Sequence, residues 1–272
     1  MLSALCSLPS ALYLYLMDTS RNTIYSDLVK ARQLGKKKLA VLIDPDIHRL
    51  GRLDEVIEIA THCRIDYFLV GGSLLVNSQL DQCLKTIRQR CQIPTVIFPG
   101  NSYQLSHHAD AILFLSLVSG RNPDLLIGQQ VIAAPYLRMS PLEVMPTAYM
   151  LIDGGVPTTV QYMSNTAPIP SNKTDIAVST AMAAEMLGLR VIFMDAGSGA
   201  TRPISADMIR AVRNAVSVPL IVGGGIRTPE KVQENLAAGA DVIVIGNAVE
   251  HDPSLMIDLA GTVHAHNFEL NV

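Results

Sequence analysis

The sequence lacks the features that mark disulfide-bonded, zinc-binding and nucleic-acid-binding proteins. Its four cysteines form no CxxC pair and have no histidines at ligand spacing, which argues against a zinc site or a disulfide framework. The 21 basic residues are scattered and the net charge is only −3, so no basic stripe is available to bind nucleic acid. We therefore expect a protein of the reducing cytoplasm that has no nucleic-acid partner.

The apolar N-terminal segment also lacks the marks of a targeting sequence. No Lys or Arg precedes Arg21, Pro9 interrupts the apolar run, and the run is short for a membrane span. Translation from Met17 would remove most of this segment, and that alternative stays open. We expect residues 1–25 to form a leader and residues 26–272 to form one domain, because no linker, low-complexity tract or charge block divides the rest.

Short β-branched runs alternate with amphipathic stretches along most of the chain. This order is typical of βα units around a parallel sheet, and strands that are apolar on both faces fit a sheet buried on both sides. A chain of 272 residues with 49% hydrophobic content suits one large core. The sequence thus predicts an α/β fold, a single (β/α)8 TIM barrel, with strands at 39–43, 66–70, 94–98, 111–117, 148–152, 191–195, 219–223 and 241–245. The irregular stretch 153–174 is expected to be an active-site loop.

Oxygen-bearing side chains follow the first two predicted strands, where this fold builds its active site. The segment DPD (44–46) places two carboxylates two residues apart across a proline that stiffens the turn, an arrangement suited to a hard cation such as Mg²⁺. The segment GGS (71–73) adds glycines and the Ser73 hydroxyl, which can reach the same ion or a phosphate. Taken alone, Asp44 can equally be a helix N-cap and GGS a plain turn.

Glycine-rich segments follow the last three predicted strands. They are FMDAGSG (193–199), GGGIR (223–227) and GN (246–247). Glycines remove side chains so that successive backbone N–H groups converge on an anion, and phosphate sites in these barrels lie after strands seven and eight. One such segment also makes an ordinary tight turn. Three at successive strand ends predict phosphate-binding loops after strands 6 to 8.

These segments together resemble one family, the geranylgeranylglyceryl phosphate synthases and their bacterial relatives, the heptaprenylglyceryl phosphate synthases. The likeness extends from about Leu39 to Glu250. Its marks are VLIDPD (41–46), VGGSLL (70–75), NTAPIPSNK (165–173), FMDAGSGA (193–200), VGGGIR (222–227) and IGNAVE (245–250). Generic phosphate-binding barrels share the GGG loop but not the other segments in this order. The AGSGA form is similar to the second of the family's two sequence groups.

The resemblance implies a Mg²⁺-dependent prenyltransferase. It would join a long-chain prenyl diphosphate to the 3-hydroxyl of sn-glycerol 1-phosphate, making an ether-lipid precursor and diphosphate. Asp44 and Ser73 match the family's metal and diphosphate positions, and Asp195 matches the acidic position that orients or deprotonates the hydroxyl. The glycerol phosphate positions match Phe193, Met194, Asp195, Ala196, Gly197, Ser198, Gly199, Gly224, Gly225, Gly246 and Asn247. The resemblance also implies a homo-oligomer, and the lipid product implies peripheral contact with a membrane.

The sixth-strand motif departs from the family, because FMD stands where YLE is usual. The ring at Phe193 is kept without its hydroxyl, and Asp195 is shorter than Glu by one C–C bond, about 1.5 Å. Two other functions therefore stay open: another phosphosugar enzyme such as an isomerase or aldolase, and a barrel that binds a polyol phosphate without turning it over. Asp195 can also be a helix cap or a structural acceptor. Four methionines near the fourth and fifth units either line a prenyl groove or fill the core: Met139, Met145, Met150 and Met163.

Overall fold

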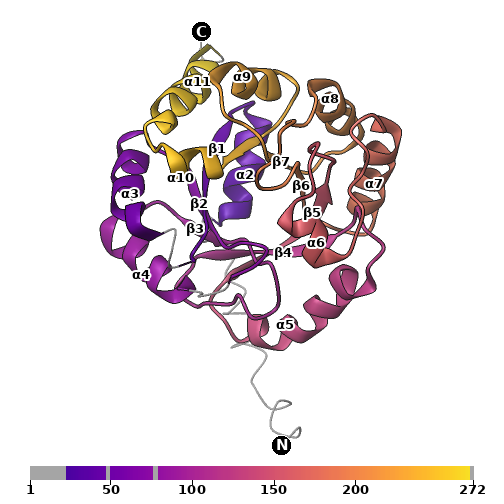
Figure 1. The fold of residues 1–272 in the computed structure, drawn as a ribbon, viewed down its shortest axis with the longest axis horizontal. Helices are drawn as coiled ribbons and strands as arrows, with labels where there is room; N and C mark the ends of the chain where they lie inside the picture. Colours follow the sequence, from indigo (N-terminus) through magenta and orange to yellow (C-terminus); the bar gives the residue numbers. More distant parts are fainter. Residues whose placement is uncertain (1–22, 47–49, 76–78, 270–272) are drawn as a thin grey trace, which may run out of the picture.

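Eight parallel strands follow one another around a closed barrel in which β8 pairs back with β1 (Figure 1). The computed structural model describes residues 23–46, 50–75 and 79–269. The strands are β1 (Lys38–Ile43), β2 (Tyr67–Val70), β3 (Thr95–Ile97), β4 (Ala111–Leu117), β5 (Glu143–Leu151), β6 (Val191–Asp195), β7 (Leu220–Gly223) and β8 (Val242–Ile245). The predicted barrel and all eight strands are confirmed. Strand β5 begins at Glu143 rather than at residue 148, because it pairs with β4 along nearly its whole length.

Helices form the outer ring of the barrel (Figure 1). They are α3 (Leu53–His62), α4 (Leu80–Arg90), α5 (Gln129–Arg138), α7 (Thr174–Met186), α8 (Ala206–Ala215), α9 (Pro229–Ala237) and α11 (Leu255–Glu269). Two short helices, α6 (Thr159–Ser164) and α10 (Asn247–His251), lie within this ring, and a 3₁₀ turn η1 (Leu50–Arg52) and a π-helical turn η2 (Asp124–Gly128) precede α3 and α5. Helix α8 illustrates the local rules. The Ser205 side chain caps its first turn, and Met208, Ile209 and Val212 form the buried stripe on one face.

The core has two layers, and strand alternation assigns each residue to one of them. Leu69, Phe193 and Val244 belong to the cluster that fills the barrel interior. Their chain neighbours, such as Met194, belong to the larger cluster between the barrel and its helices. Because successive side chains on a strand point to opposite faces, the interior positions of β6 are Val191, Phe193 and Asp195.

Helix α2 (Ile24–Gln33) closes the barrel at the N-terminal ends of the strands and lies within the ring of helices in Figure 1. The backbone N–H groups of Ile24 and Tyr25 donate to the Glu143 carboxylate at 2.7 and 3.1 Å, at the first residue of β5. Leu28 packs into the interior cluster. The expected boundary between residues 25 and 26 therefore falls inside a barrel helix. Most of the predicted leader, with the alternative start at Met17, lies outside the described residues.

The predicted active-site loop 153–174 contains helix α6, which the sequence did not suggest. The Thr158 side chain accepts from the Gln161 N–H and caps this short helix. A single bridge between Ile152 and Ile169 returns the loop to the end of β5. Both α6 and α10 lie over the same face of the barrel (Figure 1).

Candidate active site

A polar cavity of about 130 Å³ opens at the carboxyl ends of the strands. It gathers residues that follow β1, β2, β6, β7 and β8, which are far apart in the sequence. Of the predicted site residues, it is lined by Asp44, Ser73, Phe193, Asp195, Gly197, Ser198, Gly199, Gly224, Gly225, Gly246 and Asn247. The fold therefore brings the two predicted halves of the site, acidic and glycine-rich, to one place.

Met194 and Ala196 are the predicted site residues that do not line this cavity. Both side chains are buried in the layer between barrel and helices. Strand alternation turns every second side chain away from the interior, so these two side chains do not line the cavity, and their assignment to the glycerol phosphate site stays a prediction.

The glycines let three loops approach one another closely. A Cβ added to Gly224, whose φ is +82°, would lie 2.6 Å from the Asp195 Oδ1 and 2.6 Å from the Ala196 N. The Ser198 hydroxyl donates to the Asn247 Oδ1 at 2.9 Å and joins the loops after β6 and β8. Backbone N–H groups in such loops form concave sites for anions.

Arg227 is the only basic side chain among the described residues that line the polar cavity. Its guanidinium donates to the Ala200 carbonyl at 3.2 Å, which holds it beside the loop after β6. Arg227 belongs to the segment GGGIR, but the glycine pattern of that segment does not indicate a role for its side chain. A cation at this place favours an anionic ligand.

Asp195 is buried in the cavity wall with both carboxylate oxygens engaged. Oδ2 accepts from the Tyr149 hydroxyl at 2.6 Å, and Oδ1 accepts from the Gly197 N–H at 2.8 Å. Burial raises the pKa of Asp195 above its ordinary value, while the two hydrogen bonds oppose that rise. Burial also raises the pKa of Tyr149, so this phenol stays protonated and remains the donor. The result is a fixed carboxylate of raised basicity, as a general base requires.

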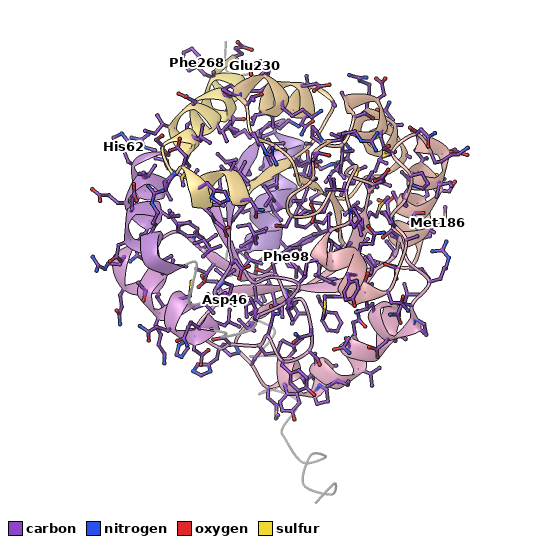
Figure 2. All side chains as sticks on the ribbon, in the orientation of Figure 1. Asp46, His62, Phe98, Met186, Glu230 and Phe268 are labelled. Atoms are coloured by element: carbon purple, nitrogen blue, oxygen red, sulfur yellow. The ribbon has the colours of Figure 1, made fainter. Side chains whose placement is uncertain are left out.

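Tyr149 supplies the hydroxyl that Phe193 lacks. The two residues are partners in the register between β5 and β6, with rings edge to face at 5.7 Å. Phe98 stacks on Phe193 at 5.1 Å and completes an aromatic trio near the centre of the barrel face, where Figure 2 labels Phe98. Sequence reasoning missed Tyr149 because it lies inside a strand rather than at its end. The sequence signal that could have found Tyr149 is the two-residue alternation of side chains along β5, which turns its ring into the barrel interior.

Asp44 and Ser73 line the same cavity. A Cβ on Gly72 would lie 3.3 Å from the Asp44 Oδ2, so the loop after β2 rests against this carboxylate. Within the described residues there is no group of three or more His, Cys, Asp or Glu side chains that could hold a metal. Asp44 and Ser73 fit Mg²⁺ as hard oxygen donors, because that ion usually takes few protein ligands and fills its shell with phosphates and water.

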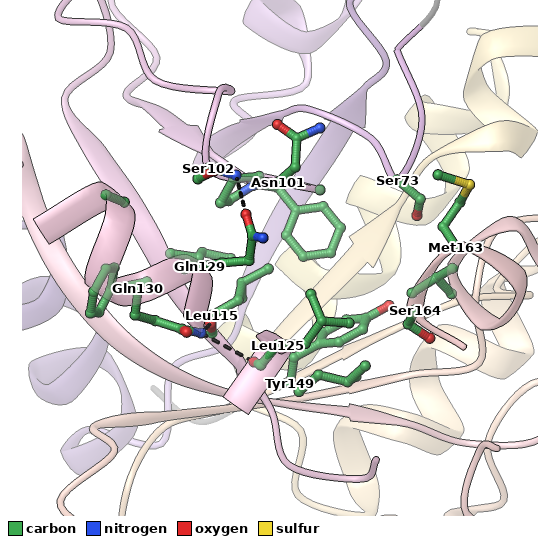
Figure 3. A pocket seen from close by; sticks show the side chains of 18 of the residues that line it. Ser73, Asn101, Ser102, Leu115, Leu125, Gln129, Gln130, Tyr149, Met163 and Ser164 are labelled. Atoms are coloured by element: carbon green, nitrogen blue, oxygen red, sulfur yellow. Dashed lines mark hydrogen bonds between the residues drawn. The ribbon is translucent and has the colours of Figure 1, made fainter. Parts of the chain in front are cut away.

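A second, largely apolar cavity of about 300 Å³ adjoins the first. Figure 3 shows Ser73, Met163 and Ser164 on one side of it and Leu115 and Gln130 on the other. The two cavities share Gly72, Ser73, Leu74, Phe98, Tyr149 and Val160. The apolar walls come from Leu105, Ile112, Leu113, Leu115, Leu117, Leu125, Ala133 and Leu137.

The four methionines near the fourth and fifth units have different surroundings. Met163 lines the apolar cavity, Met145 and Met150 are core residues, and Met139 is exposed. Met145 and Met150 therefore fill the core, and Met163 is the one of the four that lines the apolar cavity.

The barrel and its glycine-lined cavity define the class as a phosphate-binding (β/α)8 barrel. The model of the PcrB family matches residues 32–263. The geranylgeranylglyceryl phosphate synthase of Chitinophaga pinensis is 52% identical over 244 residues, which cover 90% of this chain and 97% of that relative. The synthase of the same name from Spirosoma linguale is 52% identical over 233 residues, which cover 86% of this chain and 94% of that relative. The chain belongs to the PcrB family.

A solved structure agrees with this assignment. The (S)-3-O-geranylgeranylglyceryl phosphate synthase from Thermoplasma acidophilum, in complex with its substrate sn-glycerol-1-phosphate, matches with a TM-score of 0.83 and 31% identity. The match covers 89% of this chain and 99% of that chain. The similarity therefore covers most of the chain.

Proposed function

We propose that this chain transfers a long prenyl group from its diphosphate to the 3-hydroxyl of sn-glycerol 1-phosphate, forming an ether-lipid precursor and releasing diphosphate. One observation carries the proposal: a small cavity with glycine loops and charged side chains adjoins a larger cavity with mostly apolar walls, and Ser73, Phe98 and Tyr149 line both. A small phosphate and a long hydrocarbon need neighbouring sites, one that binds an anion and one that is mainly apolar, which meet at the reacting atoms. Relatives at 52% identity carry the name of this activity.

The glycine loops anchor the phosphate of the acceptor substrate in this proposal. Backbone N–H groups near Gly199, Gly224 and Gly225 bind the phosphate, and Arg227 adds positive charge. Because the phosphate is held away from the reacting end, its binding energy orients the glycerol 3-hydroxyl toward the junction of the cavities.

Asp195 then accepts the proton of the attacking hydroxyl, and its hydrogen bonds to Tyr149 and Gly197 fix its orientation. The new C–O bond forms at the allylic carbon while the bond from that carbon to the diphosphate oxygen breaks. Positive charge that develops on the allylic group faces the aromatic rings of Phe98, Tyr149 and Phe193, whose π-faces attract cations.

Asp44 and Ser73 would hold Mg²⁺ and the diphosphate at the junction. When bound there, Mg²⁺ neutralises the negative charge that gathers on the leaving diphosphate. The two residues line the same cavity as the glycine loops, and Ser73 also lines the apolar cavity that would hold the prenyl chain.

The proposal extends to the protein's surroundings. In the described part of the chain we find no helix able to cross a membrane. Leu74 and Met163 line the apolar cavity yet are 49% and 50% exposed, and we propose that this rim touches lipid when an otherwise cytoplasmic enzyme exchanges its lipid ligands. The exposed apolar side of α5, which includes Val131, Ile132 and Tyr136, is the proposed contact of a homo-oligomer.

Transfer of label tests the proposal directly. Radiolabelled sn-glycerol 1-phosphate is incubated with farnesyl, geranylgeranyl or heptaprenyl diphosphate, with and without Mg²⁺. We expect a Mg²⁺-dependent prenyl ether with at least one of the longer chains, lost in Asp44→Ala but kept in the exposed α4 control Asp81→Ala. Binding of glycerol phosphate with no product from any diphosphate would instead favour a non-catalytic barrel, and isomerisation or cleavage of a phosphosugar would favour another enzyme class.

A further inference from the structure

A buried glutamine ties together the loops that follow β2 and β3. Gln104 is 4% exposed, and its carboxamide faces Gly72 and Gly100. Its Nε2 donates to the Gly72 carbonyl at 2.8 Å. Its Oε1 accepts from the Gly100 N–H at 3.1 Å and, more weakly, from the Gly72 N–H at 3.5 Å. One side chain therefore satisfies both backbone groups of the residue that precedes Ser73.

The contact between the two loops is too close for larger residues. A Cβ on Gly100 would lie 2.2 Å from the Gly72 carbonyl oxygen and 2.8 Å from the Ser73 Cα. Gly71, at φ +152°, would place a Cβ 2.0 Å from the Phe98 carbonyl oxygen. Backbones packed this closely leave Gly72 and Ser73 little freedom once the carboxamide is in place.

The loop that contains Gln104 is also anchored to α5. The Ser102 N–H donates to the Gln129 Oε1 at 3.0 Å, and the Gln129 Nε2 donates to the Asp124 Oδ2 at 2.9 Å. The loop 99–104 is thereby attached to α5 and η2, which wall the apolar cavity. Gln104 connects this anchored loop to the loop that carries Ser73 through its hydrogen bonds to Gly72.

We propose that Gln104 is a positioning residue for the diphosphate end of the site: it holds Gly72 beside the Asp44 carboxylate and thereby fixes Ser73 where the two cavities join. The inference rests on the proposed function, because it assigns the diphosphate to Ser73 and Asp44. Gln104 lines neither cavity among the described lining residues, so it acts through the loop and not by touching a substrate.

The test separates diphosphate binding from glycerol phosphate binding. Calorimetry measures the affinity of the full-length protein for inorganic diphosphate with Mg²⁺ and, separately, for sn-glycerol 1-phosphate. Gln104→Met removes all the carboxamide hydrogen bonds at similar size, and Gln104→Glu keeps the acceptor but loses the donor to Gly72. Thr95→Val is the control. It removes a buried hydrogen bond, 3.0 Å to Asp110, at the first residue of β3, the strand that precedes the Gln104 loop.

We expect both Gln104 variants to lose diphosphate affinity, by about tenfold or more for Gln104→Met, because about tenfold corresponds to the loss of one well-made hydrogen bond and this variant loses all those of the carboxamide. The KM for prenyl diphosphate should rise with it, while sn-glycerol 1-phosphate affinity stays within about twofold. Thr95→Val should lower Tm without changing either affinity. Unchanged diphosphate affinity in the folded variants, or equal loss of both ligands, would overturn the inference.

The inference and the proposed function fail in different ways. A wild-type protein that transfers no prenyl group, with variants that still lose diphosphate selectively, would contradict the function and leave the role of Gln104 standing. A wild-type protein that binds no diphosphate with Mg²⁺ would contradict both. Normal transfer by wild type and by both variants would contradict the role of Gln104 alone.

Discussion

The Tyr149→Phe substitution removes one hydroxyl from the site and leaves the ring. Because the phenol is buried and its ring packs edge to face against Phe98 and Phe193, the substitution keeps the aromatic trio in place. It deletes the 2.6 Å hydrogen bond to the Asp195 Oδ2, so the Gly197 N–H is the remaining donor of those described. The change therefore isolates the effect of that hydrogen bond on Asp195.

The expected loss follows from orientation. Without the Tyr149 hydroxyl, the Asp195 carboxylate is held by the Gly197 N–H alone among the donors described. Misplacement of a catalytic group costs up to about 100-fold in rate, so kcat/KM should fall by roughly 10- to 100-fold. The direction of the pH effect is also fixed. Burial already raises the pKa of Asp195 and the Tyr149 hydrogen bond lowers it, so removing that bond raises the pKa further. A base must be deprotonated to act, so the acid limb of kcat/KM should move to higher pH.

The assay is prenyl transfer measured across the acid limb for wild type, Tyr149→Phe and the exposed control Tyr103→Phe. A double variant, Tyr149→Phe with Phe193→Tyr, moves the hydroxyl to the neighbouring strand and should recover part of the activity. The account would be refuted if Tyr149→Phe kept kcat/KM within about twofold of wild type and left the acid limb where it was.

Three further substitutions test the base, the glycine loops and the closing helix. Asp195→Asn should abolish transfer yet raise Tm. Burial raises the pKa of this carboxyl, so its ionised form destabilises the fold at neutral pH. A lower Tm in a thermal melt would contradict the predicted stabilisation. Gly224→Ala should lower the affinity for sn-glycerol 1-phosphate at least tenfold, because the added Cβ would lie 2.6 Å from Asp195 and the φ of this residue is +82°. Calorimetry measures this affinity, and a wild-type value would argue against phosphate binding by the glycine loops. Glu143→Ala should lower the free energy of unfolding by about 1–3 kcal/mol, because the N–H groups of Ile24 and Tyr25 in α2 lose their acceptor, while glycerol phosphate affinity is kept. Denaturant unfolding measures this change, and an unchanged midpoint would contradict the role of Glu143.

The barrel and most of the site could be predicted because their signals are local. Each strand is a short apolar run, and each loop segment lies directly at a strand end, so the fold class alone places Asp44, Ser73 and the glycines on one face. Met194 and Ala196 belong to the same contiguous segment, but their side chains do not line the cavity. The pleat of β6 sends alternate side chains to opposite layers, and that alternation decides which residues line a cavity.

Other features depend on contacts between distant residues and have no local signal. Helix α2 is fixed by Glu143, 119 residues away from Ile24. Tyr149 becomes part of the site because register sets it beside Phe193 and lets its hydroxyl reach Asp195. Gln104 acts on a glycine 32 residues before it. These roles follow from tertiary geometry, in which a residue's partners matter more than its neighbours in sequence.

The most direct measurement is a crystal structure of the protein with sn-glycerol 1-phosphate, Mg²⁺ and an unreactive thio analogue of geranylgeranyl diphosphate. The account predicts the glycerol phosphate on the loops at Gly199, Gly224 and Gly225, its 3-hydroxyl beside Asp195, and the prenyl chain in the apolar cavity. The diphosphate should lie at Asp44 and Ser73. A phosphate bound outside the glycine loops, or a prenyl chain outside the apolar cavity, would contradict the central claim that the two joined cavities hold the two substrates.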